Sequence, residues 1–234
     1  MGMPVSIDIP DATSSDVFQK IFGYFRHVDQ QFSPYKESSE VSLFAKGAIS
    51  KQELSADLLS VMEQCDHYEK LTNGYFSAYY AGVFDPSGYV KAWAINSASA
   101  LLAELGFDTF LINIGGDMVA RGDIRSWNLA IQDPFDVQAI LGTVQLTNKA
   151  IATSGSYVRG NHIFDPHTKK HDSDLISVSI YGDSIVQADV FATACIAMGY
   201  DKARAFLRTQ PDYAALLVKQ NGESEKLNNF SLNY

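Results

Sequence analysis

The spacing of apolar and polar positions predicts helices in the first half of the chain. Between residues 15 and 31, apolar side chains recur at the three- and four-residue intervals of an amphipathic helix. They are Phe18, Ile21, Phe22, Phe25 and Val28. Similar spacing predicts helices over about residues 54–68 and 90–105. Before the first helix, alternation of apolar and polar residues over positions 5–9 predicts an opening strand.

In the second half, short runs of β-branched residues bounded by Gly, Asp or Asn predict strands. The runs cover residues 109–115, 127–133, 142–148, 149–155, 175–182 and 214–220. Residues 187–198 are the exception, because they are typical of a buried helix. Helices gathered early and strands gathered late predict an α+β fold. With no linker-like stretch in 234 residues, we expect one domain over residues 1–234.

Charge, apolar content and cysteine number exclude several classes of protein. A formal charge of −9 argues against a nucleic-acid partner, because such binding needs clustered Lys and Arg. No apolar run reaches the roughly 20 residues of a membrane span, and the first residues lack a secretory signal. We therefore expect a soluble, cytoplasmic protein unless a leader was removed. Cys65 and Cys195 are too few for a disulfide framework and are expected to be reduced core thiols.

Two polar residues interrupt the apolar helix predicted over residues 187–198. Asp189 and Thr193 are four positions apart, so both side chains lie on one helix face. A carboxylate and a hydroxyl would give Mg²⁺ part of the oxygen shell that it prefers. The alternative is that Asp189 caps the helix while Thr193 bonds back to its own turn.

Two small-residue segments are candidates for binding an anion through the backbone. Gly115 and Gly116 precede Asp117 directly after a predicted strand, and Thr153 and Ser154 precede a further glycine. Each segment could equally be a plain turn. Neither matches a Walker loop or a G-x-G-x-x-G motif, so the usual nucleotide-binding folds are not supported.

Other candidates lie in turns. Asp85 begins a turn ahead of the helix at 90–105, where Lys91 places a cation in the first turn. A cation there is unfavourable against the helix dipole, which hints at a bound phosphate. His162, in the segment HIFDP, could be a general base or a structural histidine. The histidines at 167 and 171 belong to a polar segment that we expect to be solvated.

Taken in order, eight segments resemble the ApbE family, the FAD:protein FMN transferases, over nearly the whole chain. They are FSPYKESSEV, NGYF, DPSGYVKAWA, NIGGD, W-x-LAIQDP, ATSGSY, HIFDP and ADVFATA. The resemblance implies a compact, T-fold-related α+β domain of helices and antiparallel sheet. It also implies that the protein binds FAD with Mg²⁺, cleaves the pyrophosphate and releases AMP. FMN then joins a Ser or Thr of an acceptor protein, in a motif rich in Ser, Gly, Ala and Thr.

The resemblance also implies roles for individual residues. Asp189, Thr193 and a backbone oxygen of Gly88 would hold the metal, with Asp189 and His162 counted as catalytic. The flavin nucleotide would contact a larger set, in which the last three lie near the adenosine or pyrophosphate. This set is Met1, Tyr75, Phe76, Asp85, Lys91, His162, Ile163, Asp117, Thr153 and Ser154.

The sequence also departs from the family pattern. Phe76 is followed by Ser77 where the family usually has Asp, and only a short segment separates Phe76 from Asp85. That segment normally helps to cover the flavin, so we expect a compact variant of the site. Two alternatives remain open: a Mg²⁺-dependent FAD pyrophosphatase without an acceptor, and a non-catalytic flavin carrier.

Overall fold

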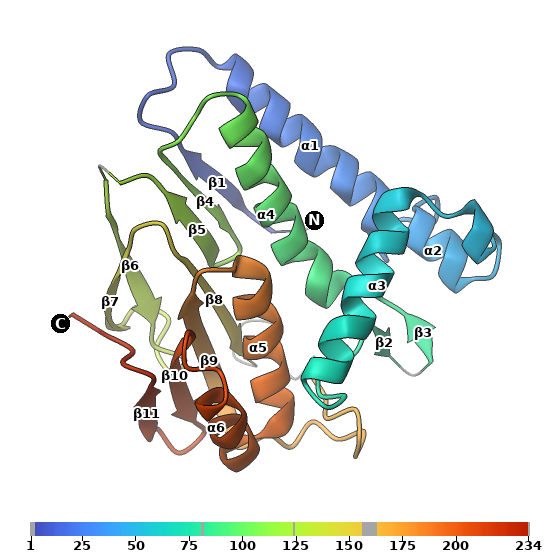
Figure 1. Cartoon of the computed structure of the whole chain (residues 1–234). Coiled ribbons are helices and arrows are strands. Elements are labelled where there is room, and N and C mark those ends of the chain that lie inside the picture. Colours follow the sequence, from blue (N-terminus) through green and yellow to red (C-terminus); the bar gives the residue numbers. More distant parts are fainter. Residues whose placement is uncertain (1–2, 81, 124, 156–162, 234) are drawn as a thin grey trace.

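A seven-stranded antiparallel sheet organises the molecule (Figure 1). The computed structural model describes residues 3–80, 82–123, 125–155 and 163–233. The strand order is β1-β4-β5-β8-β9-β10-β11. The strands are β1 (Val5–Asp8), β4 (Phe110–Ile114), β5 (Asp117–Arg121), β8 (Ala150–Gly155), β9 (Leu175–Gly182), β10 (Ala214–Lys219) and β11 (Ser224–Leu227). Neighbouring strands pair antiparallel throughout, as the α+β prediction requires.

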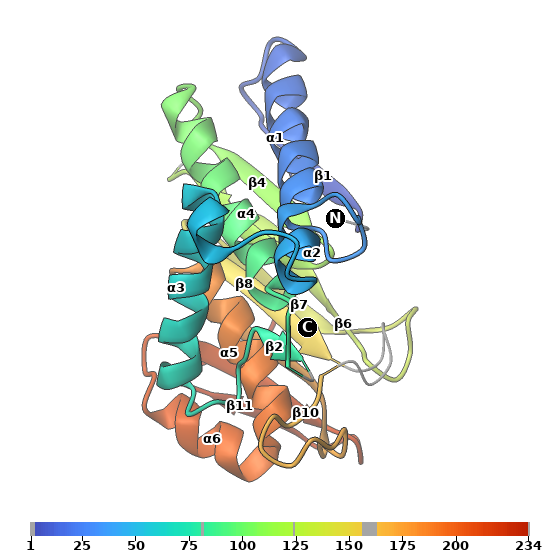
Figure 2. The same cartoon turned by 90° about the vertical axis from the view of Figure 1, so that its right-hand side faces the viewer.

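Helices cover one face of this sheet in two layers (Figures 1 and 2). The inner layer consists of α1 (Asp16–Phe32), α4 (Ser87–Glu104), α5 (Ile185–Met198) and α6 (Tyr200–Arg208). The outer layer holds α2 (Glu40–Ala45), the 3-10 turn η1 (Lys51–Glu53) and α3 (Ala56–Leu71). A small hairpin of β2 (Tyr79–Tyr80) and β3 (Val83–Phe84) precedes α4. The large core between helices and sheet draws on residues from Ile9 to Leu227.

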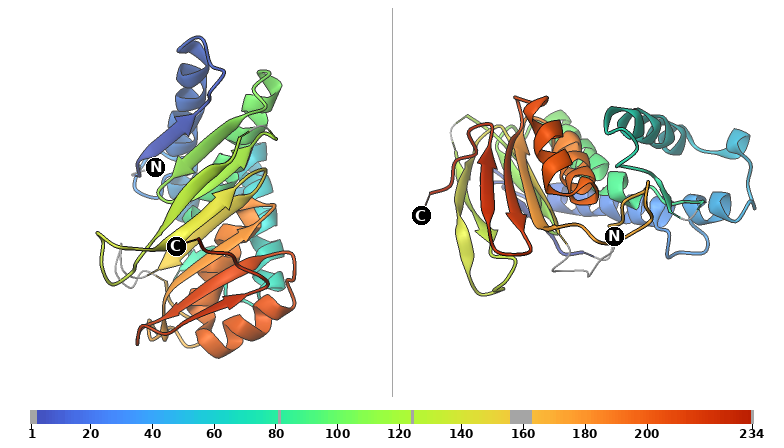
Figure 3. Two further views of the ribbon diagram at one scale, coloured as in Figure 1. Left: turned by 90° about the vertical axis from the view of Figure 1, so that its left-hand side faces the viewer. Right: turned by 90° about the horizontal axis from the view of Figure 1, so that it is seen from below.

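A β-hairpin covers the opposite face of the sheet (Figure 3). It consists of β6 (Trp127–Gln132) and β7 (Ile140–Leu146). Period-two alternation along the strands divides their side chains between the two faces. In β10, for example, Leu217 packs in the core under the helices, while Leu216 and Val218 pack in a second core under the hairpin. Both faces of the sheet are therefore buried.

Local signals set the element boundaries, and some differ from the prediction. Helix α4 begins at Ser87, three residues before the predicted start, because Asp85 Oδ1 accepts a hydrogen bond from the Ser87 N–H at 2.9 Å. Helix α3 begins after its N-cap Ser55 rather than at Leu54. The helices α2 and α6 and the strands β2, β3, β5 and β11 were not predicted. These elements are too short to show a clear period in the sequence.

The cysteines are as predicted. Cys65 and Cys195 are both buried free thiols. Burial raises the pKa of the Cys65 thiol to about 12, with the nearby Asp66 and Glu69 adding to the shift. Within the described part of the chain, no helix has the length and apolar character needed to cross a bilayer.

Candidate functional site

Three charged side chains from three elements meet beneath the helices. The Lys91 Nζ of α4 lies 2.6 Å from Asp117 Oδ2 of β5 and 3.2 Å from Asp189 Oδ1 of α5. The side chains of both aspartates are almost completely buried, and that of Lys91 is 18% exposed. When all three are ionised, the cluster carries one net negative charge. Such a charge is costly away from water unless another cation balances it.

Burial and neighbouring charges shift the pKa values in this cluster. Burial is the largest effect on Asp189, and together with the charge of Asp117 it raises the pKa of Asp189 to about 7. For Lys91, burial acts to lower the pKa, but the two carboxylates outweigh it and raise the pKa above its usual value. Lys91 therefore stays protonated. Asp189 is the member of the cluster whose negative charge is least stabilised by its surroundings.

The hydroxyl predicted beside Asp189 lies against strand β8. Thr193 Oγ1 is 3.0 Å from Ser154 Oγ, so these two predicted site residues share a hydrogen bond. Thr153, the residue before Ser154, has its Oγ1 2.8 Å from Ser179 Oγ in the adjacent strand. Successive side chains of a strand point to opposite faces. Ser154 thus faces the helices beside Thr193, whereas the Thr153 side chain faces the other side of the sheet and only its N–H reaches Asp117 Oδ1, at 3.2 Å.

Several alternatives from the sequence are now decided. Ser184, not Asp189, is the N-cap of α5, where its side chain accepts from the Gln187 N–H. The partner of Thr193 is Ser154, in another element. The described part of the segment at 152–155 is the end of strand β8, and a contact of Thr153 or Ser154 with a nucleotide stays a prediction. The counter-ions of Lys91 are two aspartates of the protein itself, so the cation gives no sign of a bound phosphate.

The GGD segment is a tight turn between two strands. It joins β4 to β5, and Gly115 and Gly116 have φ values of +61° and +97°. These conformations favour glycine. Asp117, the first residue of β5, is fully buried. Its carboxylate is used by Lys91 and by the Thr153 N–H, so its contacts favour an indirect role in the site. A direct contact of Asp117 with a nucleotide stays a prediction.

The remaining predicted residues lie on neighbouring segments. Asp85 fixes the start of α4, and Gly88 lies exposed in its first turn. Tyr75 and Phe76 follow the end of α3, and Phe76 is buried. Ile163 begins the segment after β8 and packs against the main core. Met1 and His162 lie outside the described residues.

The donor set suits a hard cation. Asp189 Oδ2 is buried and has no hydrogen-bond partner among the described residues. Together with the Thr193 hydroxyl it provides oxygen ligands of the kind that Mg²⁺ takes, usually with one or two carboxylates. Within the same residues, no three His, Cys, Asp or Glu side chains cluster tightly enough to hold an ion by themselves. The residues present fit a magnesium site completed by substrate and water better than an all-protein site.

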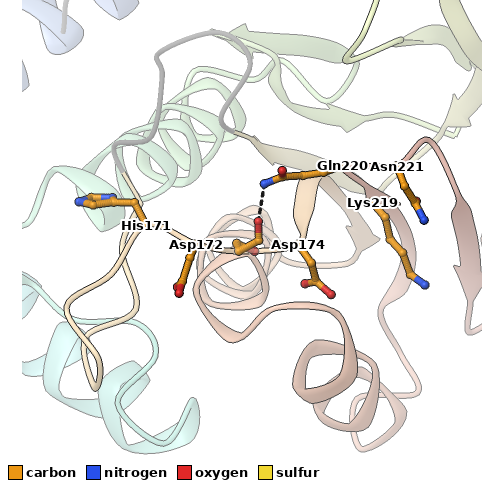
Figure 4. A pocket seen from close by; sticks show the side chains of 7 residues that line it. His171, Asp172, Asp174, Lys219, Gln220 and Asn221 are labelled. Atoms are coloured by element: carbon orange, nitrogen blue, oxygen red, sulfur yellow. Dashed lines mark hydrogen bonds between the residues drawn. The ribbon is translucent and has the colours of Figure 1, made fainter.

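Two surface cavities open elsewhere. One, of about 650 Å³, lies between residues 171–174 and the turn at 219–221, where the Gln220 side chain donates to the Ser173 carbonyl (Figure 4). The other, of about 310 Å³, lies between residues 163–174 and the end of α5. Neither is lined by Asp189 or Thr193. We take the charged cluster as the candidate site, because strongly shifted pKa values of buried groups such as Asp189 are typical of functional sites.

Comparison with known proteins identifies relatives for nearly the whole chain. A family model described as "ApbE family" matches residues 1–85 and 81–217. An FAD:protein FMN transferase of Treponema pallidum is 33% identical over 155 residues, which cover 57% of this chain and 43% of that protein. The chain thus spans less than half the length of such curated relatives.

Solved structures extend the likeness at the level of the fold. The flavin transferase ApbE from Vibrio cholerae superposes with a TM-score of 0.77 at 23% identity, over 97% of this chain and 94% of that one. The ApbE protein from Thermotoga maritima gives a TM-score of 0.83 at 19% identity, over 96% and 94%. The same arrangement of helices and antiparallel sheet is therefore present in all three.

Proposed function

The chain belongs to the ApbE family, and from that premise we propose that it is a Mg²⁺-dependent FAD:protein FMN transferase whose catalytic domain spans residues 1–234. The observation that carries the proposal is the cluster around Asp189. Among the described residues, the buried Asp189 Oδ2 has no hydrogen-bond partner, and Thr193 follows Asp189 by one helical turn on the same helix. When Lys91, Asp117 and Asp189 are all ionised, the cluster carries one net negative charge. The names of the curated relatives support the same activity.

In the proposed reaction, a Ser or Thr hydroxyl of an acceptor protein attacks the FMN phosphorus of FAD. A new P–O bond forms to the hydroxyl oxygen, the pyrophosphate P–O bond breaks, and AMP leaves with the bonding electron pair. The hydroxyl proton must pass to a base, because a neutral hydroxyl is a poor nucleophile. His162 is our candidate for that base.

Asp189, Thr193 and the Gly88 carbonyl are the residues that would hold the metal. Bound there, Mg²⁺ would supply positive charge against the charge that develops on the leaving phosphate. Lys91 and Asp117 hold Asp189 in place through the ion pairs across α4, α5 and β5. The remaining predicted contacts, at Met1, Tyr75, Phe76, Asp85 and Ile163, would bind and orient the flavin nucleotide.

The test is incubation with FAD, Mg²⁺ and an acceptor domain that contains a Ser/Gly/Ala/Thr motif. A transferase gives a fluorescent, gel-stable acceptor adduct and one AMP for each FMN attached. The pyrophosphatase alternative would release free FMN and AMP without labelling the acceptor. Intact FAD after long incubation would favour the carrier and contradict the proposal.

Variants of the cluster test the residue assignments. We expect Thr193→Val to lower transfer about a hundredfold, because it removes the hydroxyl and keeps the shape. Thr193→Ser keeps the hydroxyl and should stay close to wild type. Wild-type turnover in Thr193→Val would remove that residue from the site.

His162→Ala should bind FAD but transfer FMN slowly. His27→Ala, on an exposed face of α1, serves as its matched control.

A further inference from the structure

The segment that follows His162 in the chain closes on itself. The Asp165 N–H donates to the Lys170 carbonyl at 2.8 Å, and the Lys169 N–H donates to the Asp165 carbonyl at 2.7 Å. His171 Nδ1 lies 3.0 Å from the Ile163 carbonyl. Residues 163–171 are therefore a compact hairpin-like unit, which we call the 163–171 segment. Its two histidines, His167 and His171, are exposed, as predicted.

A second compact unit lies at the end of α3. Thr72 is fully buried, and its Oγ1 accepts a hydrogen bond from the Phe76 N–H at 3.0 Å. Asn73 and Gly74 both adopt left-handed backbone conformations, with φ of +52° and +80°. This turn fixes the direction in which Tyr75 and Phe76 leave the helix. Both are predicted flavin contacts.

His167 joins these two units, which lie side by side at the lower end of α3 in Figure 1. Its Nε2 is 2.9 Å from the Asn73 carbonyl, an acceptor, so Nε2 carries the proton of this bond. Its ring lies edge-on to Tyr75, with 4.6 Å between the centroids. A Cβ on Gly74 would come within 3.3 Å of the ring, so the approach is close.

Tyr75 is also held by a residue of α6. Lys202 Nζ of α6 donates to the Tyr75 hydroxyl at 2.6 Å and lies 5.1 Å from the centre of its ring. Within the 163–171 segment, the backbone N–H of His167 donates to the side-chain Oδ1 of Asp165 at 2.8 Å, which helps to fix the backbone that carries the imidazole. The imidazole thus connects this segment to the backbone of the turn at 72–76 and contacts the ring of Tyr75.

We propose that His167 is a positioning residue of the flavin site: it clamps the 163–171 segment to the turn at 72–76. Through that clamp it sets the relative places of Tyr75, Ile163 and the chain next to His162. This inference rests on the proposed function, because it gives these residues a common ligand in FAD. His167 itself is not expected to contact the reacting atoms.

The contacts indicate the size of the effect. One hydrogen bond between partly exposed groups is worth about a fivefold to tenfold change in an equilibrium. We therefore expect His167→Ala to raise the dissociation constant and the KM for FAD about fivefold to tenfold. His167→Gln should restore most of the affinity, because its amide N–H₂ can reach the position of the Nε2–H.

The experiment compares wild type, His167→Ala, His167→Gln and the control His27→Ala. FAD affinity is measured by flavin fluorescence titration, kcat and KM by AMP release, and local opening by hydrogen exchange of the 163–171 amides. We expect faster exchange and weaker FAD binding in His167→Ala only. His167 is exposed, so its loss should leave the thermal midpoint nearly unchanged.

Two outcomes would overturn the inference while the proposed function stands. One is an active wild type with the same FAD affinity and amide exchange in His167→Ala. The other is a loss of affinity that His167→Gln does not restore. Lys202→Met gives an independent check, since it removes the hydrogen bond to the Tyr75 hydroxyl and the cation's contact with the Tyr75 ring, and it should also weaken FAD binding. If wild type neither binds nor cleaves FAD, the failure belongs to the proposed function.

Discussion

At the residue scale, Lys91 has the most demanding environment of the described side chains in the site. It neutralises one of two buried carboxylates, whose charges would otherwise face each other. Local reasoning from the helix N-terminus suggested an external anion, because the sequence does not show which distant residues approach the ammonium. The two carboxylates come from β5 and α5, and only packing brings them to α4.

This environment predicts a large stability cost for Lys91→Met. Breaking a buried ion pair leaves uncompensated charge and costs about 3–5 kcal/mol. Lys149→Met is the matched control, because Lys149 pairs with Asp183 on the surface, where the two side chains are 36% and 73% exposed. Its cost should not exceed about 1 kcal/mol. Urea unfolding of both variants measures the difference, and equal midpoints would show that the Lys91 cluster is not buried.

At the element scale, the junction between β9 and α5 positions Asp189. Gly182 ends β9, and a Cβ there would lie 2.3 Å from the Tyr213 ring. That ring covers the chain just before Ser184 caps α5, and its hydroxyl donates to the Gln187 side chain. The sequence predicts that a strand ends at this glycine. It does not show that the Tyr213 ring approaches the glycine so closely.

Gly→Ala substitutions at two positions should therefore have opposite signs. Gly182→Ala must displace the Tyr213 ring and is expected to destabilise the protein by about 1–3 kcal/mol. Gly23→Ala lies within α1, where the nearest atom to a new Cβ is an arginine side-chain nitrogen at 3.8 Å. It should stabilise the protein by about 0.5–1 kcal/mol through helix propensity. Thermal unfolding of the two variants tests the contrast, and a neutral Gly182→Ala would contradict the packing at this junction.

At the scale of the whole molecule, helices and hairpin bury both faces of one sheet, and the site lies between sheet and helices. A ligand that joins α4, α5 and β8 should therefore stabilise the folded chain as a unit. At a hundredfold excess over its dissociation constant, a ligand adds about 2.7 kcal/mol. For a chain of this length that corresponds to a rise in the thermal midpoint of about 5–10 °C.

We expect that rise in wild type when FAD and Mg²⁺ are added together, and a smaller one with FAD alone. Asp189→Asn keeps the size of the side chain and should lose the Mg²⁺-dependent part of the rise in the thermal midpoint. Differential scanning fluorimetry of both proteins, with EDTA as the metal-free reference, measures this rise. An equal Mg²⁺-dependent shift in Asp189→Asn would place the metal elsewhere.

The sequence by itself determined the longer elements, their order and the chemical types at the site. Side-chain periodicity reports which face of an element is buried and so predicted α1, whereas a run of β-branched residues predicted β9 and a nearly continuous apolar stretch predicted the helix that carries Asp189. The ordered segments also gave the family, which the comparisons confirm. The expected reduced thiols are likewise buried.

Only the tertiary structure decided what those residues contact. It brought Lys91 to Asp117 and Asp189, paired Thr193 with Ser154, and separated Thr153 from Ser154 across a strand. It also gave His167, which is exposed as predicted, a hydrogen bond to the Asn73 carbonyl. The physical reason is that periodicity is local, whereas ion pairs and hydrogen bonds between elements depend on how distant segments pack.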